Sequence, residues 1–574
     1  MKEGFRQSMA WLHTWTGLVV GWVLFFVFVT GTAGYFDDEI TRWMKPELPL
    51  ASKPEPYDSQ KLIALGMGRL QQVADGAKQW QITLPHHSTR VREYKGLEIS
   101  WEDMPRDGHD FGRRGSEKLD RQTGQFVHDV EARDTGGGRT LYVMHYILHY
   151  MPYNVGILIV GVCTMLMLLA VVTGVITHKK IFKDFFTFRP GKGQRSWLDA
   201  HNVVSVMSLP FFLMITYTGL LFFAFDYMPA ARDVVYGTGQ VEQKPMYDEL
   251  YRRFNDPHDP MKPPAADLQA MIRQAEAQWG AGQVATLRIA RPQGAAPLVD
   301  VGRVPGARVD VYEAETLRFD ADNGQPLPPE SRGRSGARTS QATLLSLHEG
   351  NFADTWLRWL YFVSGLMGCA VIGTGLVLWT VKRRGKHKGQ NTATRIDHYG
   401  LKLVETLNVG TLIGLPLGVA VYFWANRLLP LGMADRAEWE MHALFLTWGW
   451  ALLYGSLRPI KRAWYELSWL TVAAYGLLPL LNALTTDRHL GVTLAYGDWV
   501  LAGFDLTMLA LALVFVYIAR KIRRKWLGSA PAAARSAAGK PAGAAGSAAA
   551  GPASASASAS TATSRVTSSG VTSS

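Results

Sequence analysis

The chain has 574 residues, 48% of them hydrophobic and only 19% charged, with a formal net charge of +12. Several apolar runs reach the roughly 20 residues that a helix needs to cross a bilayer, so the composition excludes an ordinary soluble protein. The basic residues gather in the links between these runs, where they set the orientation in the membrane. We therefore do not interpret the charge as nucleic-acid binding, and we expect membrane lipid as the surrounding partner.

Eight transmembrane helices are expected. Lys2 and Arg6 precede the first apolar run as they would in a secretory signal, but this run is long for a signal and contains His13 and Trp15, so we interpret it as a retained helix. The predicted spans lie near 11–35, 141–177, 198–225, 355–381, 399–424, 439–457, 464–484 and 494–519.

Basic residues mark the links that are expected to face the cytoplasm. By the positive-inside rule, both termini then lie on the cytoplasmic side. These residues follow spans two, four, six and eight: Lys179, Lys180, Lys183, Arg189, Lys192 and Arg195; Lys382, Arg383, Arg384, Lys386 and Lys388; Arg458, Lys461 and Arg462; and Arg520, Lys521, Arg523, Arg524 and Lys525.

The predicted fold class is an all-α polytopic membrane protein with two external α+β insertions, at 36–140 and 227–345. Both insertions end in a similar turn signature, Asp120-Arg121-Gln122-Thr123-Gly124-Gln125 and Asp320-Ala321-Asp322-Asn323-Gly324-Gln325. This similarity indicates that a unit of helix, insertion and helix is duplicated. Two unrelated loops with common hairpin turns are the alternative.

The other expected parts follow from the spans. The tail is rich in Ala, Ser, Gly, Thr and Pro, has almost nothing to bury, and is therefore expected to be disordered. The parts are helix 1 (1–35), helices 2 and 3 with their basic link (141–226), helix 4 (346–385), helices 5–8 (398–519) and the tail (520–574).

The two cysteines, Cys163 and Cys369, lie within spans two and four. The chain has no Cys-x-x-Cys-His for covalent haem attachment, and it has too few thiolates for an iron–sulfur cluster. Any haem would therefore be of the b type, held by side chains alone.

Histidines lie at the ends of the first four spans. His13 and His201 open spans that run outward from the cytoplasm, whereas His145, His149 and His348 lie near the external face. Ionisable side chains in a membrane are costly and usually mark cofactor or ion sites. Two clusters on opposite faces suit a two-haem electron path, because each iron takes two imidazoles from facing helices. For each histidine alone, interfacial anchoring is the alternative.

Two further histidines have open roles. His149 follows His145 by one helical turn, as a second ligand, a supporting group or a substrate contact. His178 lies beside Lys179 and Lys180, where interfacial anchoring and ligation are equally expected.

The motifs around these histidines resemble those of PepSY-associated transmembrane (PepSY-TM) proteins over about residues 5–385. The segment from Thr173 to Phe186 resembles the branch of this family that is linked to bacterial iron uptake. The other motifs are Leu12-His13-Thr14-Trp15-Thr16-Gly17-Leu18, Met144-His145-Tyr146-Ile147-Leu148-His149, Asp199-Ala200-His201-Asn202, Leu209-Pro210-Phe211, Thr218-Gly219-Leu220 and Leu347-His348-Glu349-Gly350.

The resemblance implies an inner-membrane reductase with two b haems, which passes electrons from the cytoplasmic side to a ferric siderophore in the periplasm. It implies that His13 and His201 ligate the inner haem, and that His145 and His348 ligate the outer haem. His149 and His178 match positions that this branch usually fills with histidine. Phe212 departs from the pattern, because many relatives are expected to have histidine there.

The electron donor is expected to be a quinol or an external flavin-bearing reductase, since no Gly-rich dinucleotide fingerprint follows a predicted strand. Haem propionates would need basic partners. The candidates are Arg6 or Arg195 on the inside and Arg139 or Arg358 on the outside.

Two other functions are alternatives. A non-haem PepSY membrane module would sense a ligand or regulate a peptidase through its insertions. A transporter would move haem or the intact ferric siderophore, and broken helices or intramembrane carboxylates would favour it. The carboxylates in the expected spans five and eight are Glu405, Asp498 and Asp505.

Overall fold

The fold is taken from a computed structural model, in which Met1–Arg523 and Arg524–Ser574 are two compact units. The predicted tail beyond residue 527 and most of the basic link after span two lie outside the described residues. The structure describes residues 3–50, 56–87, 94–105, 112–128, 130–178, 185, 189, 191, 193–251, 258–306, 315–328, 336–387 and 395–527.

Within the described residues, seven helices are long and apolar enough to cross a membrane, which confirms a polytopic membrane protein. The eighth prediction, 439–457, lies in helix α16 (Arg436–Leu457), whose first turns carry charged residues. The seven are Gly4–Gly34, Tyr153–Thr177, Gln194–Phe222, Thr355–Arg384, His398–Leu428, Ile460–Thr485 and Trp499–Trp526.

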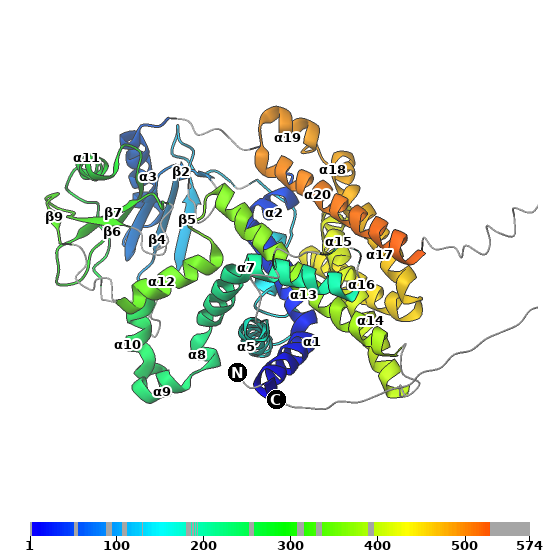
Figure 1. The fold of residues 1–574 in the computed structure, drawn as a ribbon. Coiled ribbons are helices and arrows are strands. Elements are labelled where there is room, and N and C mark those ends of the chain that lie inside the picture. Colours follow the sequence, from blue (N-terminus) through cyan, green and yellow to red (C-terminus); the bar gives the residue numbers. More distant parts are fainter. Residues whose placement is uncertain are drawn as a thin grey trace, which may run out of the picture. The chain divides into compact units, whose positions relative to one another are not determined.

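Four of these helices form what we name the histidine bundle. Helices α1 and α7 each pack against both α5 and α13, so the four helices close into a ring (Figure 1). Buried apolar side chains from α1, α5 and α7 meet between them. The bundle consists of α1 (Glu3–Gly34), α5 (Tyr153–Thr177), α7 (Gln194–Phe222) and α13 (Thr355–His387).

The second span is shorter than predicted. Instead of one helix over 141–177, the structure has α4 (Gly137–Met144) and α5, separated by residues 145–152. Pro152 precedes the first turn of α5, and Tyr150 has a φ of 65°, a left-handed conformation that a helix does not accommodate. His145 and His149 therefore lie in the connection between two helices and not within the span.

The remaining long helices form the C-terminal bundle, which joins the histidine bundle where α14 packs against α1 and α13. It contains α14 (Arg395–Leu412), α15 (Gly414–Leu428), α16, α17 (Ile460–Gly476), α18 (Leu478–Thr485), α19 (Leu490–Tyr496) and α20 (Trp499–Ile522).

The helical structure continues beyond the predicted start of the tail at residue 520. Helix α20 ends at Ile522 and a π-helical turn covers Arg523–Leu527. Arg520 and Lys521 in the last turn of α20 complement the negative end of the helix dipole, which favours helix at this point.

The two insertions contribute their main strands to one seven-stranded sheet, in the order β5-β4-β1-β6-β7-β8-β9. Strand β1 pairs antiparallel with β6 and joins the insertions, with Gln81 opposite Arg288. The strands are β1 (Gln79–Thr83), β4 (Glu98–Glu102) and β5 (Arg114–Lys118) from the first insertion, and β6 (Val284–Ala290), β7 (Leu298–Arg303), β8 (Thr316–Asp320) and β9 (Pro326–Leu327) from the second.

Helices α3 (Ser59–Val73) and α11 (Leu268–Trp279) pack against this sheet and share its apolar core (Figure 1). Most of the other described elements are short, and the two longest are the helices Gln240–Tyr251 and Gly336–Glu349. These other elements are α2 (Asp37–Met44), β2 (His86–His87), β3 (Tyr94–Lys95), α8 (Ala224–Tyr227), α9 (Ala230–Tyr236), α10 (Gln240–Tyr251) and α12 (Gly336–Glu349).

Both insertions contain a helix that is followed by three strands of the seven-stranded sheet, α3 with β1, β4 and β5, and α11 with β6, β7 and β8. Asp58 caps α3 and Asp267 caps α11, each by accepting a hydrogen bond from the backbone N–H two residues later. In the turns, Gly124 and Gly324 have φ values of 70° and 75°, which favour glycine. The unit of helix, insertion and helix therefore appears once from α1 to α5 and again from α7 to α13.

Candidate cofactor-binding site

The structure brings His13 of α1 and His201 of α7 together. Their ring centroids lie 6.3 Å apart, with an interplanar angle of 64°. Both side chains line a cavity of about 360 Å³ inside the histidine bundle. This first cavity is walled mainly by apolar and small residues, among them Gly17, Gly21, Leu209, Val371 and Leu376.

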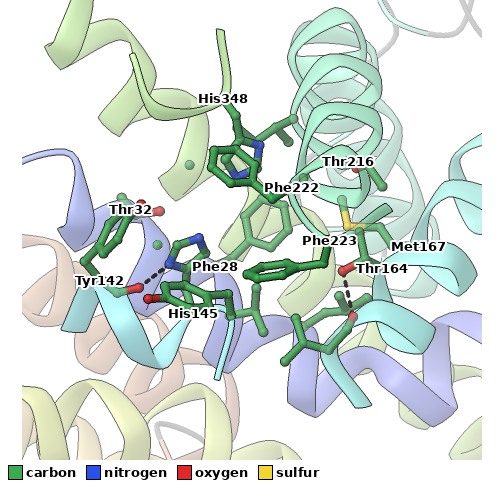
Figure 2. Close-up of a pocket in the computed structure, with 18 of the residues that line it drawn as sticks. Phe28, Thr32, Tyr142, His145, Thr164, Met167, Thr216, Phe222, Phe223 and His348 are labelled. Atoms are coloured by element: carbon green, nitrogen blue, oxygen red, sulfur yellow. Dashed lines mark hydrogen bonds between the residues drawn. The ribbon is translucent and has the colours of Figure 1, made fainter. Parts of the chain in front are cut away.

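His145 and His348 form a second pair at the end of the bundle from which the insertions leave. His145 follows α4, and His348 lies in the last turn of α12. Their ring centroids lie 6.2 Å apart, with an interplanar angle of 22°. Both line a second cavity of about 280 Å³, and Figure 2 shows Phe222 and Phe223 beside them.

The spacing within both pairs fits one metal ion between two imidazoles. A metal ion lies about 2.0 Å from an imidazole nitrogen that binds it, and this nitrogen lies roughly 1.1 Å from the ring centroid. Two imidazoles on opposite sides of one ion therefore have centroids about 6 Å apart. The observed 6.3 and 6.2 Å agree with this geometry.

In the first pair, Nδ1 of each imidazole is held by the protein. The Nδ1–H of His13 donates to the carbonyl of Ala170 at 2.8 Å, and that of His201 donates to the carbonyl of Val371 at 3.1 Å. A carbonyl only accepts, so Nδ1 must carry the hydrogen in both rings. Metal-binding histidines commonly donate their second N–H in this way, which leaves Nε2 as the metal ligand.

The second pair follows the same rule. The Nδ1–H of His145 donates to the carbonyl of Tyr142. The Nδ1–H of His348 donates to the hydroxyl of Thr218 at 3.0 Å, because that hydroxyl already donates to the carbonyl of Met214. Each Nε2 is therefore the unprotonated nitrogen of its ring.

His145 and His348 lie outside the membrane-spanning helices, and burial keeps both rings neutral. Burial lowers the pKa of His145 to about 4 and that of His348 to about 3. Metal ions bind the neutral imidazole, so both rings are in the ligating form at neutral pH.

Two imidazoles are too few to hold a bare metal ion, since a structural zinc ion takes four ligands. In the described part of the chain, no group of three or more His, Cys, Asp or Glu residues is arranged to hold a metal ion. A porphyrin supplies the missing four nitrogens and needs apolar walls, which both cavities have. The first cavity, at about 360 Å³, lies at the lower end of the roughly 300–1,000 Å³ found for ligand pockets, and the second, at about 280 Å³, lies just below it. The residues present therefore fit b-type haem.

The other two predicted histidines lie in different surroundings. His178, directly after α5, lines the first cavity together with His13 and His201. His149 stacks on Phe445 of α16 at 5.5 Å, and its Nε2 lies 3.5 Å from a carboxylate oxygen of Glu438. His178 is thus beside the first pair, whereas His149 contacts the C-terminal bundle.

Among the described residues that line the cavities, none of the four arginines proposed as propionate partners is present. Arg358 instead pairs with Glu39, and the guanidinium of Arg139 lies 4.4 Å from the ring centroid of Tyr142. Lys382 lines the first cavity. The sequence did not indicate this position, because Lys382 belongs to a basic cluster that was interpreted only as a sign of membrane orientation. The second cavity offers the tyrosines Tyr35, Tyr142, Tyr146, Tyr153 and Tyr227.

The two cavities adjoin each other. Leu24 of α1 and Met167 of α5 line both of them. Phe212, at the position expected to hold histidine in relatives, lines the first cavity and packs edge-to-face on Phe28 of the second, with centroids 6.0 Å apart. Apolar and aromatic side chains therefore form the partition between the cavities.

Comparison with known proteins agrees with the extent of this region. Residues 10–382 contain both histidine pairs and both insertions, and they match a family described as the PepSY-associated TM region. An uncharacterized protein of Pseudomonas aeruginosa is 23% identical over 396 residues, which are 67% of this chain and 92% of that protein.

Proposed function

The chain belongs to the family of PepSY-associated transmembrane proteins, and we propose that it is a di-haem b oxidoreductase of the bacterial inner membrane. It takes electrons from a quinol or from a flavin-bearing reductase on the cytoplasmic side. It delivers them to a ferric siderophore in the periplasm and releases Fe(II) for iron uptake.

The observation that carries this proposal is the geometry of the two histidine pairs. Both have the centroid separation of two imidazoles that share one metal ion, at 6.3 and 6.2 Å. All four Nδ1 atoms have protein partners that leave Nε2 for a metal. Bis-histidine ligation leaves no open position on iron, which suits electron transfer better than oxygen chemistry.

The positions of the pairs support a path across the membrane. The first pair lies near the starts of α1 and α7, and the second lies at the opposite ends of these helices, where the insertions begin. Basic residues that flank the spans support a cytoplasmic position for the first end by the positive-inside rule. Those in described segments include Arg195, Arg383, Arg384, Arg458, Arg462 and Arg520.

The proposed reaction needs only one electron for each iron. When bound, the two haems would supply a relay that carries one electron at a time. The donor loses one electron, and the siderophore-bound Fe(III) gains it and becomes Fe(II). A siderophore's hard oxygen ligands hold Fe(III) far more tightly than Fe(II), so reduction releases the metal. His13, His201, His145 and His348 would hold the two haems, and Leu24 and Met167 line both cavities.

The first test is a haem count on the purified full-length protein, by pyridine haemochrome, together with reduced-minus-oxidised spectra. We expect about two b haems per chain, one for each histidine pair. His201→Ala should remove the inner haem only and His348→Ala the outer haem only. His128→Ala, in the first insertion, is the matched control and should retain both. The dithionite-reduced protein should then be reoxidised by a ferric siderophore, with Fe(II) trapped by a chelator.

A chain that binds no haem despite adequate haem supply would overturn the reductase and leave the sensor or transporter. The helix breaks between α14 and α15 and between α17 and α18 are the kind of feature a transporter uses. The three carboxylates named in the sequence analysis are however held by the protein itself. Asp498 pairs with Arg42 and Glu405 with Arg384, while Asp505 accepts from Trp43 and Asn482.

A further inference from the structure

The four helices of the histidine bundle each carry a Thr-Gly dipeptide that lies against one histidine. The glycines are Gly31 of α1, Gly174 of α5, Gly219 of α7 and Gly375 of α13, and we name them the docking glycines. Each of the four contacts a different imidazole of the two pairs: Gly31 contacts His145, Gly174 contacts His13, Gly219 contacts His348 and Gly375 contacts His201.

The fit between ring and glycine is close. A Cβ added to Gly219 would lie 2.9 Å from Cε1 of His348, and one added to Gly174 would lie 3.1 Å from Cε1 of His13. The corresponding distance is 3.3 Å from Gly375 to Cε1 of His201. Cε1 is bonded to Nε2, so a side chain at these positions would push directly on the ligating end of the ring. Gly31 differs, because its nearest atoms in His145 are Cβ and Cγ, at 3.5 Å.

The missing side chain also opens the helix backbone to the ring. The carbonyl that accepts from His13 belongs to Ala170, four residues before Gly174, and the one that accepts from His201 belongs to Val371, four residues before Gly375. In an α-helix this carbonyl points toward the N–H of the glycine itself, on the same face. Each of these two rings therefore reaches the carbonyl across the glycine.

Threonine hydroxyls also act as acceptors in the second repeat. Thr218 accepts from His348 at 3.0 Å, and Thr374 lies 3.2 Å from Nδ1 of His201. Both hydroxyls donate their own hydrogen to a carbonyl four residues earlier in the helix, at 2.7 Å, so toward the imidazole they can only accept.

The contacts repeat with the duplication. His13 of α1 lies on α5 and His201 of α7 lies on α13, which are equivalent helices in the two repeats. His13 precedes Thr30 by 17 residues, and His201 precedes Thr218 by the same 17. Each histidine thus lies on a glycine of its own repeat, whereas each pair combines histidines from both repeats.

Ordinary helix packing does not account for this pattern. Other glycines of the bundle face other side chains, since a Cβ on Gly21 would meet Leu376, one on Gly365 would meet Thr32 and one on Gly368 would meet Phe28. A second Thr-Gly dipeptide in α1 ends in Gly17, which has nothing within 4 Å.

We propose that Gly174, Gly219 and Gly375, with Thr218 and Thr374, are positioning residues for the haem ligands. They hold the rings of His13, His201 and His348 against a helix, help to fix the hydrogen on Nδ1 and aim Nε2 into the cavity. This inference rests on the proposed function, because it assigns the residues that orient the ligands of the two haems.

Alanine substitutions in the full-length chain test the glycines one at a time. Gly219→Ala should weaken or remove the outer haem only, and Gly174→Ala the inner haem only. Loss of a group that orients a metal ligand typically costs about 10–100-fold in affinity. Gly375→Ala should affect the inner haem less, and Gly31→Ala should retain both haems, since its new Cβ would make only an ordinary contact.

The matched control is Gly455→Ala in α16, where the added Cβ would lie 2.8 Å from Cγ1 of Val409, as close as any contact at the docking glycines. It should retain two haems. The readouts are haems per chain, the low-spin ferric EPR signals and the midpoint potential of each haem.

Threonine variants separate ligand orientation from simple packing. An acceptor on Nδ1–H makes the imidazole a stronger donor to ferric iron, so Thr374→Val should raise the inner potential and Thr218→Val the outer one. A tenfold change in the relative affinity for the two iron states corresponds to about 59 mV. Thr374→Ser and Thr218→Ser keep the acceptor and should restore the wild-type potentials.

The outcomes distinguish this inference from the proposed function. A wild-type chain with two haems, combined with wild-type haem content, EPR signals and potentials in Gly219→Ala and Gly174→Ala, would overturn the inference alone. A wild-type chain without haem would overturn the proposed function and the inference with it.

Discussion

The histidine bundle and the C-terminal bundle both contain buried ionisable residues, but they use them in opposite ways. In the C-terminal bundle, Arg436 and Glu440 are fully buried and pair with each other at 2.6 Å. Asn426 also donates to Glu440, at 2.7 Å. In the histidine bundle, the ionisable rings instead present Nε2 toward cavities of about 280 and 360 Å³.

This difference teaches how to interpret a buried polar residue. Burial alone does not mark a functional site, because Asp505 and Arg436 are fully buried and form hydrogen bonds with neighbouring helices. The informative property is where the polar atom of a buried side chain points. Where it has a protein partner the residue is structural, and where it faces a cavity the residue is a ligand candidate.

The largest expected effect tests whether the buried charges of the C-terminal bundle stabilise the fold. Arg436→Met leaves the buried Glu440 carboxylate without its cation, and such a loss typically costs about 3–5 kcal/mol. Arg458→Met is the matched control, because its pair with Glu466 is partly exposed and worth about 0–1 kcal/mol. Unfolding of the detergent-solubilised protein by denaturant measures both, and equal small losses would contradict the structural role.

A second prediction contrasts the packed interior with the cavity walls. Leu444→Ala in α16 removes a fully buried side chain and should cost about 2–5 kcal/mol. Leu209→Ala in α7 should cost less than about 2 kcal/mol in haem-depleted protein, because this side chain borders the first cavity and has fewer packed neighbours to lose. The same unfolding assay compares them, and a larger loss for Leu209→Ala would show that the cavity wall is packed as tightly as the C-terminal bundle.

The smallest expected effect concerns the duplicated turns. Asp120 accepts from the backbone N–H groups of Gln122 and Thr123, and Asp320 accepts from those of Asp322 and Asn323. Asp120→Ala and Asp320→Ala should therefore lower the melting temperature slightly and by similar amounts. Clearly unequal shifts would contradict the equivalence of the two turns.

These turns also carry a pH dependence. The hydrogen bond from the backbone of Thr123 is the main cause of the lowered pKa of Asp120. A carboxyl with a lowered pKa stabilises the folded state above its usual titration range, and this contribution is lost as the pH falls through the folded pKa. The difference between the wild type and Asp120→Ala should therefore disappear in acid, which a pH series of melting curves would measure.

Much of this architecture follows from local sequence patterns. Apolar runs of sufficient length locate the spans, and the histidines at their ends indicate which residues meet. The break at residues 145–152 escaped prediction because the apolar character continues through it while the backbone turns at Tyr150 and Pro152. His149 was misleading for the same reason, since one helical turn of spacing has meaning only within a helix.

Long-range pairings were beyond the sequence. Periodicity indicates strands but not their partners, so it did not reveal that β1 and β6 join the insertions. The acceptors for Nδ1 were missed as well. Thr374 and Val371 look like ordinary apolar-helix residues until the imidazole of His201 is placed against them. The recurring Thr-Gly dipeptide is the signal that could have indicated them.

The pairing of β1 with β6 has a consequence for how the protein folds during synthesis. Neither repeat can finish the sheet alone, and neither holds both histidines of a pair. The first half therefore leaves the ribosome with an unpaired strand edge and half of each ligand set, a state prone to misassembly. Capture of the proposed haems could begin only after α7 and α12 have been synthesised and inserted. Haem loading would then report that both halves of the duplicated region have met.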